Sequence, residues 1–287
     1  MAESNTTATS TVKSTTSVQA KKSSNLISLL APIICIVAGY IIWRFVIGAS
    51  SNFSSPDPAG GFWPDHKGPK TSFSRMYDGG IIVPLLIGLF LIVFTFVIER
   101  WLTIAKANGT GSNAEFVRKV QFYLADKKID AAIAECDRQK GSVGNVMKAG
   151  LRRYKTMITE QGLDTEQKVL AIQKEVEEAT ALELPMLEKN LVFLSTIASV
   201  ATLIGLLGTV VGMIRAFSNL GSSGGSEATR ELSVGISEAL YNTALGIGTS
   251  AFAIITYNIF TTKIDGITYA IDESGFTLTQ SFASLYK

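Results

Sequence analysis

Hydrophobic positions along the chain gather into four long runs with almost no charge. They extend from Ser23 to Trp43, from Gly79 to Ile98, from Asn190 to Ile214 and from Leu232 to Thr262, where Glu238 is the only charged side chain. An α-helix needs roughly 20 apolar residues to cross about 30 Å of hydrocarbon. Buried helices of soluble proteins are seldom this long without a charge. The pattern therefore predicts four transmembrane helices.

The polar block between the second and third runs has helical periodicity. Apolar residues recur there at i, i+3 or i+4 and i+7, as expected of amphipathic helices. The last of these helices is expected to continue into the third run, with a bend near Pro185. The three stripes are Phe116, Val120 and Tyr123; Val143, Met147, Gly150, Leu151 and Tyr154; and Val169, Ile172, Val176 and Ala179.

Lys and Arg set the expected orientation. Arg100, Lys106, Lys189 and Lys263 flank the runs on one side, which the positive-inside rule assigns to the cytoplasm. We therefore predict an all-α polytopic membrane protein whose long transmembrane helices extend into a cytoplasmic helical bundle, with both termini cytoplasmic. The expected segments are a disordered cytoplasmic tail (1–24), an extra N-terminal transmembrane helix (25–48), a periplasmic loop (49–78), transmembrane helix 2 (79–101), the cytoplasmic helical domain (102–189), transmembrane helix 3 (190–217), a second periplasmic loop (218–231), transmembrane helix 4 (232–262) and a cytoplasmic C-terminal tail (263–287).

The first run has two readings. Basic residues, an apolar stretch and then Gly48-Ala49-Ser50 resemble a cleaved signal peptide. However, the stretch is longer than the roughly 7 to 15 residues of such a peptide, and Arg44 interrupts the approach to any cleavage site. We favour a retained membrane anchor over a cleaved peptide. The Pro- and Gly-rich segment that follows is expected to be a loop without a folded domain.

Composition argues against several classes of function. The net charge of +2 gives no support for nucleic-acid binding, and the single histidine, His66, cannot build a metal site by itself. Cys35 and Cys136 are expected to be buried or incidental thiols rather than a disulfide framework. The sequence offers no nucleophile–base pair and no cofactor motif. We therefore expect no enzymatic activity, no cofactor and no metal.

Small residues follow one face of each of the last two runs. Helices in lipid associate closely where small residues let their backbones approach. Helix packing alone is a sufficient explanation for the glycines among them, Gly205, Gly208, Gly212, Gly235 and Gly246.

Glu238 is the unusual residue of the fourth run. A charge at the bilayer centre costs roughly 2.5 to 3.5 kcal/mol, so an ionisable side chain there is a functional-site candidate. Because the run is longer than the hydrocarbon core, Glu238 has an equally weighted second reading as an interfacial carboxylate, solvated or paired with Arg215 or Arg230.

Two threonines accompany this acid. Thr209 and Thr243 lie on the small-residue faces of their runs, and Asn242 and Thr249 lie close to the face of Glu238. One threonine in a membrane helix often only bonds back to its own i−4 carbonyl, but two in facing grooves near an acid favour a narrow wet path. We predict that Thr209, Glu238 and Thr243 line a proton pathway at a shared water-accessible seam, with Asn242 and Thr249 as additional pore-lining residues.

These runs resemble the ExbB/TolQ (MotA-like) proton-channel family. GLLGTVVGMI at Gly205–Ile214 and GISEALYNTALGIGTSAFAIITYN at Gly235–Asn258 are similar to its two signatures, and IERW at Ile98–Trp101 matches a weaker feature. The resemblance covers roughly Gly79 to Lys263. The chain departs from the family at Thr202, where a proline is common, and in its first run, since the usual architecture has three spans.

The resemblance implies a bacterial inner-membrane protein that works as a homo-oligomer. In the family, usually five copies ring the single-span helices of an ExbD/TolR-like partner that carries an intramembrane aspartate. A TonB-like protein and membrane lipid are further implied partners. Thr209, Glu238 and Thr243 match family positions that line the channel or face that aspartate.

The expected function is that of a proton-channel (stator) subunit that couples the proton gradient to work at the outer membrane. TonB-dependent transport is the favoured output, with Tol-type or motility output behind it. The alternative is a non-conducting membrane scaffold that only assembles partner subunits. A proton is favoured over sodium because the chain lacks the several intramembrane carboxylates that a sodium site might use.

Overall fold

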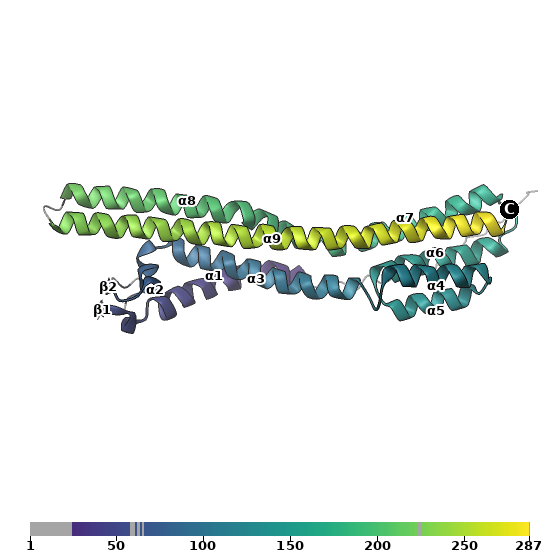
Figure 1. The fold of residues 1–287 in the computed structure, drawn as a ribbon, viewed down its shortest axis with the longest axis horizontal. Coiled ribbons are helices and arrows are strands. Elements are labelled where there is room, and N and C mark those ends of the chain that lie inside the picture. Colours follow the sequence, from purple (N-terminus) through teal and green to yellow (C-terminus); the bar gives the residue numbers. More distant parts are fainter. Residues whose placement is uncertain (1–24, 58–60, 62–63, 65, 223–225, 287) are drawn as a thin grey trace, which may run out of the picture.

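The structure is a computed structural model that describes residues 25–286, except 58–60, 62–63, 65 and 223–225. The expected tail over 1–24 therefore lies outside the described residues. The described chain is a long rod of helices with a small two-stranded sheet (Figure 1). Its elements in chain order are α1 (Asn25–Ile41), the π-helix η1 (Ile42–Ile47), η2 (Ser50–Asn52), β1 (Phe53–Ser55), β2 (Lys67–Pro69), α2 (Ser72–Arg75), η3 (Tyr77–Gly79), α3 (Ile82–Ala107), α4 (Asn113–Ala125), α5 (Ile129–Gln139), α6 (Ser142–Thr159), α7 (Thr165–Glu188), α8 (Leu191–Ser222) and α9 (Ser226–Leu285).

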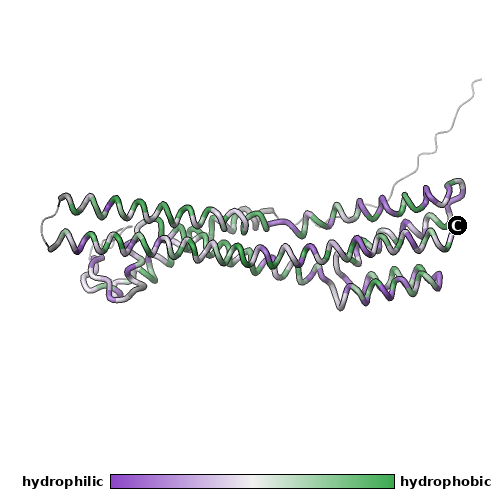
Figure 2. Tube along the Cα trace, turned by 45° about the horizontal axis from the view of Figure 1, so that its top comes forward, coloured by the Kyte–Doolittle hydropathy of each residue, from purple (hydrophilic) through white to green (hydrophobic). Residues whose placement is uncertain are grey.

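Four helical segments in the described part of the chain are long and apolar enough to cross a membrane. They are Leu30–Ile47, Ile82–Ala107, Thr165–Ser218 and Ala228–Leu285. Hydrophobic residues dominate the half of the rod that holds α1, α3 and α8, whereas hydrophilic residues are frequent in the half that holds the C-terminus (Figures 1 and 2). The chain is thus an all-α polytopic membrane protein, as the sequence predicts.

α9 is one helix of 60 residues, which at 1.5 Å per residue is about 90 Å long. The sequence predicts a transmembrane helix over 232–262 and a tail over 263–287, but the helix continues without a break to Leu285. Beyond the apolar run, charged residues alternate with buried apolar residues, and these buried residues form a stripe that packs against α6 and α7. The stripe consists of Ile264, Ile267, Ile271, Leu278 and Phe282.

α7 and α8 lie end to end and meet at a joint. The sequence predicts a bend near Pro185, but α7 continues past this proline and ends at Glu188. The break falls at Asn190, whose φ is +67°. Asparagine tolerates this left-handed conformation better than most residues, which explains why the helix stops there.

Arg100 of α3 anchors this joint. Its guanidinium is 2% exposed and donates to the carbonyl oxygens of Leu187 at 3.1 Å and Met186 at 3.3 Å. The Glu99 carboxylate accepts from Arg100 Nε at 2.6 Å and from the Asn190 amide at 3.2 Å. Carbonyls in the last turn of a helix lack intrahelical donors. Arg100 therefore satisfies the end of α7 and ties the joint to α3.

α1 packs along α3 through a contact between glycines. A Cβ on Gly39 would lie 2.6 Å from the Gly88 backbone nitrogen and 2.7 Å from the Pro84 carbonyl oxygen. Only residues without a side chain allow backbones to approach this closely in a membrane helix pair. The first apolar run is therefore a helix laid against the next one.

The segment between α1 and α3 is folded, although the sequence predicts a loop without a folded domain. β1 pairs antiparallel with β2, with Phe53 opposite Pro69. Trp43, Phe53 and Tyr77 are buried beneath this hairpin. Pro and Gly indicate the turns correctly, but three aromatic residues spaced this irregularly give no periodic signal of a core.

The polar bundle comprises α4, α5 and α6 with the far ends of α7 and α9. The predicted stripes form its core, in which Val120, Leu151 and Ile172 are fully buried. Tyr154 lies edge-on to Phe282, with ring centroids 4.8 Å apart, and burial raises the pKa of Tyr154. Cys136 is a free, buried thiol whose pKa burial raises to about 12. This thiol is a packing group, consistent with the sequence.

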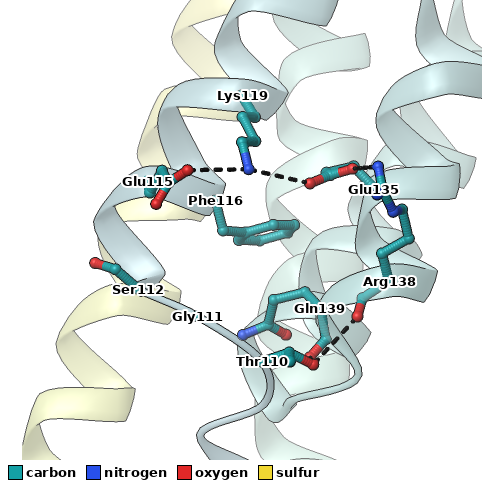
Figure 3. Close-up of a pocket in the computed structure, with 9 residues that line it drawn as sticks. All are labelled: Thr110, Gly111, Ser112, Glu115, Phe116, Lys119, Glu135, Arg138 and Gln139. Atoms are coloured by element: carbon teal, nitrogen blue, oxygen red, sulfur yellow. Dashed lines mark hydrogen bonds and ion pairs between the residues drawn. The ribbon is translucent and has the colours of Figure 1, made fainter.

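A pocket of about 220 Å³ opens between α4 and α5 of this bundle (Figure 3). Its charges pair with one another: Lys119 lies 3.1 Å from Glu115 and 3.7 Å from Glu135, which also contacts Arg138 at 3.1 Å. The buried amide of Gln139 bonds the backbone on both sides of the pocket. These groups hold α4 to α5, so the pocket has a structural explanation.

Replacement of Arg100 by methionine is expected to lower the free energy of unfolding by about 2–3 kcal/mol, because charge-assisted bonds to two helix-end carbonyls are lost. Equilibrium unfolding of the detergent-solubilised protein, followed by far-UV circular dichroism, measures this change. Lys174→Met, which removes an exposed ion pair with Glu178, is the control and should leave stability nearly unchanged. Equal losses in the two variants would contradict the anchoring role of Arg100.

Candidate functional site

The contact between α8 and α9 is built from small residues. A Cβ on Gly246 would lie 2.6 Å from the Ala201 carbonyl oxygen, and one on Gly205 would lie 3.0 Å from the Asn242 carbonyl oxygen. Farther along the seam, a Cβ on Gly212 would lie 2.9 Å from that of Ala239. Gly208 and Gly235 approach the opposite helix in the same way. All five glycines of the sequence pattern therefore lie at this seam.

Thr209 of α8 and Thr243 of α9 meet within the seam, where their hydroxyl oxygens are in hydrogen-bond contact. Both hydroxyls also lie 3.3 Å from the Gly205 carbonyl oxygen. Each hydroxyl offers one donor and two acceptor positions. One hydroxyl can therefore donate to the other, while the second donates to the Gly205 carbonyl. The hydroxyl pair is thereby held in place by backbone that cannot move away.

One side of the hydroxyl pair is open. Thr209 borders a wide, shallow groove of about 670 Å³ on the outer face of α8. The rest of the groove is almost entirely apolar, and its large side chains are exposed in the single chain. The hydroxyl pair is therefore a polar point at the edge of an apolar surface. The other lining residues are Leu206, Val210, Met213, Ile214, Phe217 and Ser218.

Glu238 and Asn242 line a different, smaller cavity of about 20 Å³ between α3, α8 and α9. Arg215 of α8 lies on its wall, and Arg215 and Asp78 are the charged groups that act on Glu238. A space of this size holds about one water molecule. Asn242 is 2% exposed and donates from Nδ2 to the Gly79 carbonyl oxygen at 3.3 Å.

The acid and the hydroxyl pair thus face different sides of α9. Glu238 precedes Thr243 by five residues, and at about 100° per residue their side chains point about 140° apart. The structure brings Thr209 and Thr243 together and brings Glu238 and Asn242 together, but the two pairs face different sides of the α8–α9 contact and do not line one shared path. Thr249 lies two turns beyond Asn242 and is 3% exposed within the packed face of α9.

Sequence reasoning missed the backbone contribution to this cavity. The Gly79 carbonyl that holds Asn242 comes from η3, a part of the chain expected to be the first residues of a span. Gly80, with a φ of +69°, lies beside the Arg215 guanidinium. The adjacent glycines at 79 and 80 were the sequence signal that could have indicated this backbone contact. Among the described residues, no three His, Cys, Asp or Glu side chains gather closely enough to hold a metal ion.

Cysteines at 209 and 243, in a chain with Cys35→Ala and Cys136→Ala, are expected to form an intramolecular disulfide on mild oxidation. The two hydroxyl oxygens that they replace are in contact, which places the sulfurs within bonding reach. Mass spectrometry of the digested protein detects the link. Thr209→Cys with Ala244→Cys is the matched control, because residue 244 is exposed and about 100° farther around α9. Equal cross-linking of both pairs would disprove this geometry.

One known protein family matches the region that contains α8 and most of α9. Residues 138–273 match the MotA/TolQ/ExbB proton channel family. The Tol-Pal system protein TolQ of Pseudomonas aeruginosa is 28% identical over 179 residues, which are 56% of this chain and 77% of that protein.

Two shorter matches have higher identity. The biopolymer transport protein ExbB of Helicobacter pylori is 44% identical over 28% of this chain and 54% of its own length. TolQ of Haemophilus influenzae is 41% identical over 30% of this chain and 37% of its own length. These relatives are named for transport and for the Tol-Pal system, not for an enzymatic reaction. Residues 138–273, slightly less than half of the chain, thus resemble the MotA/TolQ/ExbB proton channel family.

Proposed function

We propose that this chain is the channel-forming (stator) subunit of a proton-driven complex in the bacterial inner membrane. The observation that carries the proposal is the Thr209–Thr243 hydroxyl pair at the edge of an apolar groove. Polar groups are costly inside a membrane and tend to be kept where they serve an ion path. The similarity of residues 138–273 to a proton channel family supports the same function.

A threonine pair is suited to exchange a proton with a carboxyl group. A hydroxyl accepts a hydrogen bond from a protonated acid, and it donates one to a carboxylate when its proton turns away from the Gly205 carbonyl. The pair can therefore stabilise both forms without ionising itself. The Gly205 carbonyl holds both oxygens in place. A carboxyl group seated here would be desolvated on its other sides by the apolar groove, and its charge would then depend on these few hydrogen bonds.

The carboxyl group must come from outside this chain, because Glu238 faces the other cavity. We infer a single-span partner of the ExbD/TolR type whose intramembrane aspartate meets the hydroxyl pair. The groove on α8, lined by Leu206, Val210, Ile214 and Phe217, has the apolar character that a membrane helix packs against. Several copies of this chain, five in our proposal, would surround the partner helices, with membrane lipid outside and a TonB-like protein as a further partner.

The proposal includes an orientation and an output. Arg100, Lys106, Lys189 and Lys263 favour cytoplasmic termini and a cytoplasmic polar bundle. TonB-dependent transport at the outer membrane is the proposed output, ahead of a Tol-type or motility role. The relatives include both ExbB and TolQ proteins, so the identity of the partner decides between these outputs.

Thr243→Val is expected to lower proton flux about tenfold, the effect of about 1.4 kcal/mol on a barrier, because it removes a hydroxyl and keeps the shape. The native complex, purified through a tag on this chain and reconstituted in liposomes, is tested with an imposed pH gradient and internal pyranine. Thr196→Val, at an exposed threonine of the neighbouring helix α8, is the matched control. Full flux in Thr243→Val with intact assembly would exclude the hydroxyl pair from the proton path, and a wild-type complex without flux would favour the non-conducting scaffold.

Glu238→Gln keeps the size of the side chain and removes its charge. If the cavity between Glu238 and Arg215 is on the proton path, flux in the same liposomes should fall about tenfold while Thr243 remains in place. Co-purification of the partner monitors assembly. Unchanged flux would assign Glu238 to the interfacial, structural reading.

A further inference from the structure

Four aromatic rings form a compact cluster at one end of the α1–α3 pair, which we name the aromatic brace: Trp43, Phe53, His66 and Tyr77. Trp43 is fully buried and stacks on Tyr77, with ring centroids 4.3 Å apart and planes 6° from parallel. Phe53 meets Tyr77 edge-on at 5.4 Å and stacks with His66 at 4.8 Å. Aromatic pairs of this geometry are worth about 0.5–1.5 kcal/mol each beyond their buried area.

The brace is tied to the first helix and to the hairpin by directed hydrogen bonds. The Asn52 amide donates to the carbonyls of Val46 at 3.0 Å and Ile47 at 3.1 Å, at the end of η1. The Tyr77 hydroxyl donates to the Pro64 carbonyl at 3.0 Å. Burial raises the pKa of Tyr77 to about 12, so this hydroxyl stays a neutral donor. α1, η1 and the hairpin therefore act on Tyr77 as one unit.

Tyr77 is also the first residue of η3, which leads directly to the cavity. Two residues later, the Gly79 carbonyl accepts the hydrogen bond from Asn242. Val83 belongs to the same buried cluster as Trp43, and Leu245 of α9 packs against that cluster. The buried cluster that contains Trp43 and Tyr77 thus contacts α9 through Leu245, and η3 contacts it through Gly79.

Asn242 is held between two glycines. A Cβ on Gly208 would lie 2.6 Å from that of Asn242, and a Cβ on Gly79 would lie 2.9 Å from Asn242 Oδ1. With Nδ2 committed to the Gly79 carbonyl, Oδ1 is a buried acceptor without a hydrogen-bond partner among the described residues. Asn242 and Glu238 line the same small cavity. A displaced η3 would release Nδ2 and let the amide turn.

We propose that the extra N-terminal helix and the folded segment after it position Asn242 for ion entry at the Glu238 cavity, with Trp43 and Tyr77 as the positioning residues. This inference rests on the proposed channel function. The inference gives a function to the first helix, which is additional to the three spans of the usual architecture. A buried amide oxygen beside an acid can accept a hydrogen bond from water or from the protonated acid. It keeps the right direction for this bond only while the amide nitrogen is held.

The test is a double-mutant cycle in the reconstituted native complex, with proton uptake read by internal pyranine. Trp43→Ala is expected to reduce flux about tenfold, and Trp43→Phe, which keeps a stacking ring, is expected to restore most of it. Phe45→Ala is the matched control, because the adjacent Phe45 is 66% exposed. In an Asn242→Ala background, Trp43→Ala should have no further effect, since its action passes through Asn242.

Additive losses of flux from Trp43→Ala and Asn242→Ala would overturn the inference. Losses caused by general damage to the fold are additive, whereas a loss that acts through Asn242 is not. Unchanged flux in Trp43→Ala would overturn it as well. If Trp43→Ala does not assemble, Trp43→Leu, which fills the site without a stacking ring, replaces it in the cycle. A wild-type complex without proton flux would overturn the proposed function and this inference together, whereas flux that ignores Trp43 would overturn the inference alone.

Discussion

Backbone-to-backbone contact between α8 and α9 determines what the rest of this structure can do. Lipid tails are as apolar as leucine, so these helices gain little from hiding hydrophobic surface and depend on close packing and hydrogen bonds. Gly205 and Gly246 provide the approach, and the Gly205 carbonyl then lies within reach of two threonine hydroxyls. The packing surface and the polar site are therefore the same residues, and a change that loosens one disturbs the other.

The geometry of a single helix separates the two polar features of α9. Residues five apart on a helix point in different directions, so Glu238 lines the cavity between α3, α8 and α9 while Thr243 meets Thr209 beside the groove on α8. One helix thereby serves two polar sites, an enclosed one near η3 and an open one at the α8 groove. A proton that used both would pass around α9 rather than along one side of it.

Much of this arrangement follows from the sequence, for identifiable reasons. Charge-free runs and glycine spacing are strong signals because hydrocarbon excludes charge and close helices exclude side chains, so the four helices and the seam could be predicted. The fold of the segment between α1 and α3 could not, because Trp43, Phe53 and Tyr77 are far apart in the chain and follow no period. The length of α9 was hidden because Lys263 and its charged neighbours interrupt hydropathy without interrupting the helix. Likewise, the position of Glu238 relative to Thr243 follows from helix geometry, but the identity of its neighbours depends on η3.

The two antiparallel rods of this molecule differ in mechanical character. α9 is continuous for its whole length, whereas the opposite rod is divided at Asn190 into α7 and α8. A load applied at the far end of α7 is absorbed at that division, where Arg100 limits how far the pieces can separate. A load on α9 has no such release. A displacement of α9 beside the hydroxyl pair would therefore be transmitted along the continuous helix to the polar bundle.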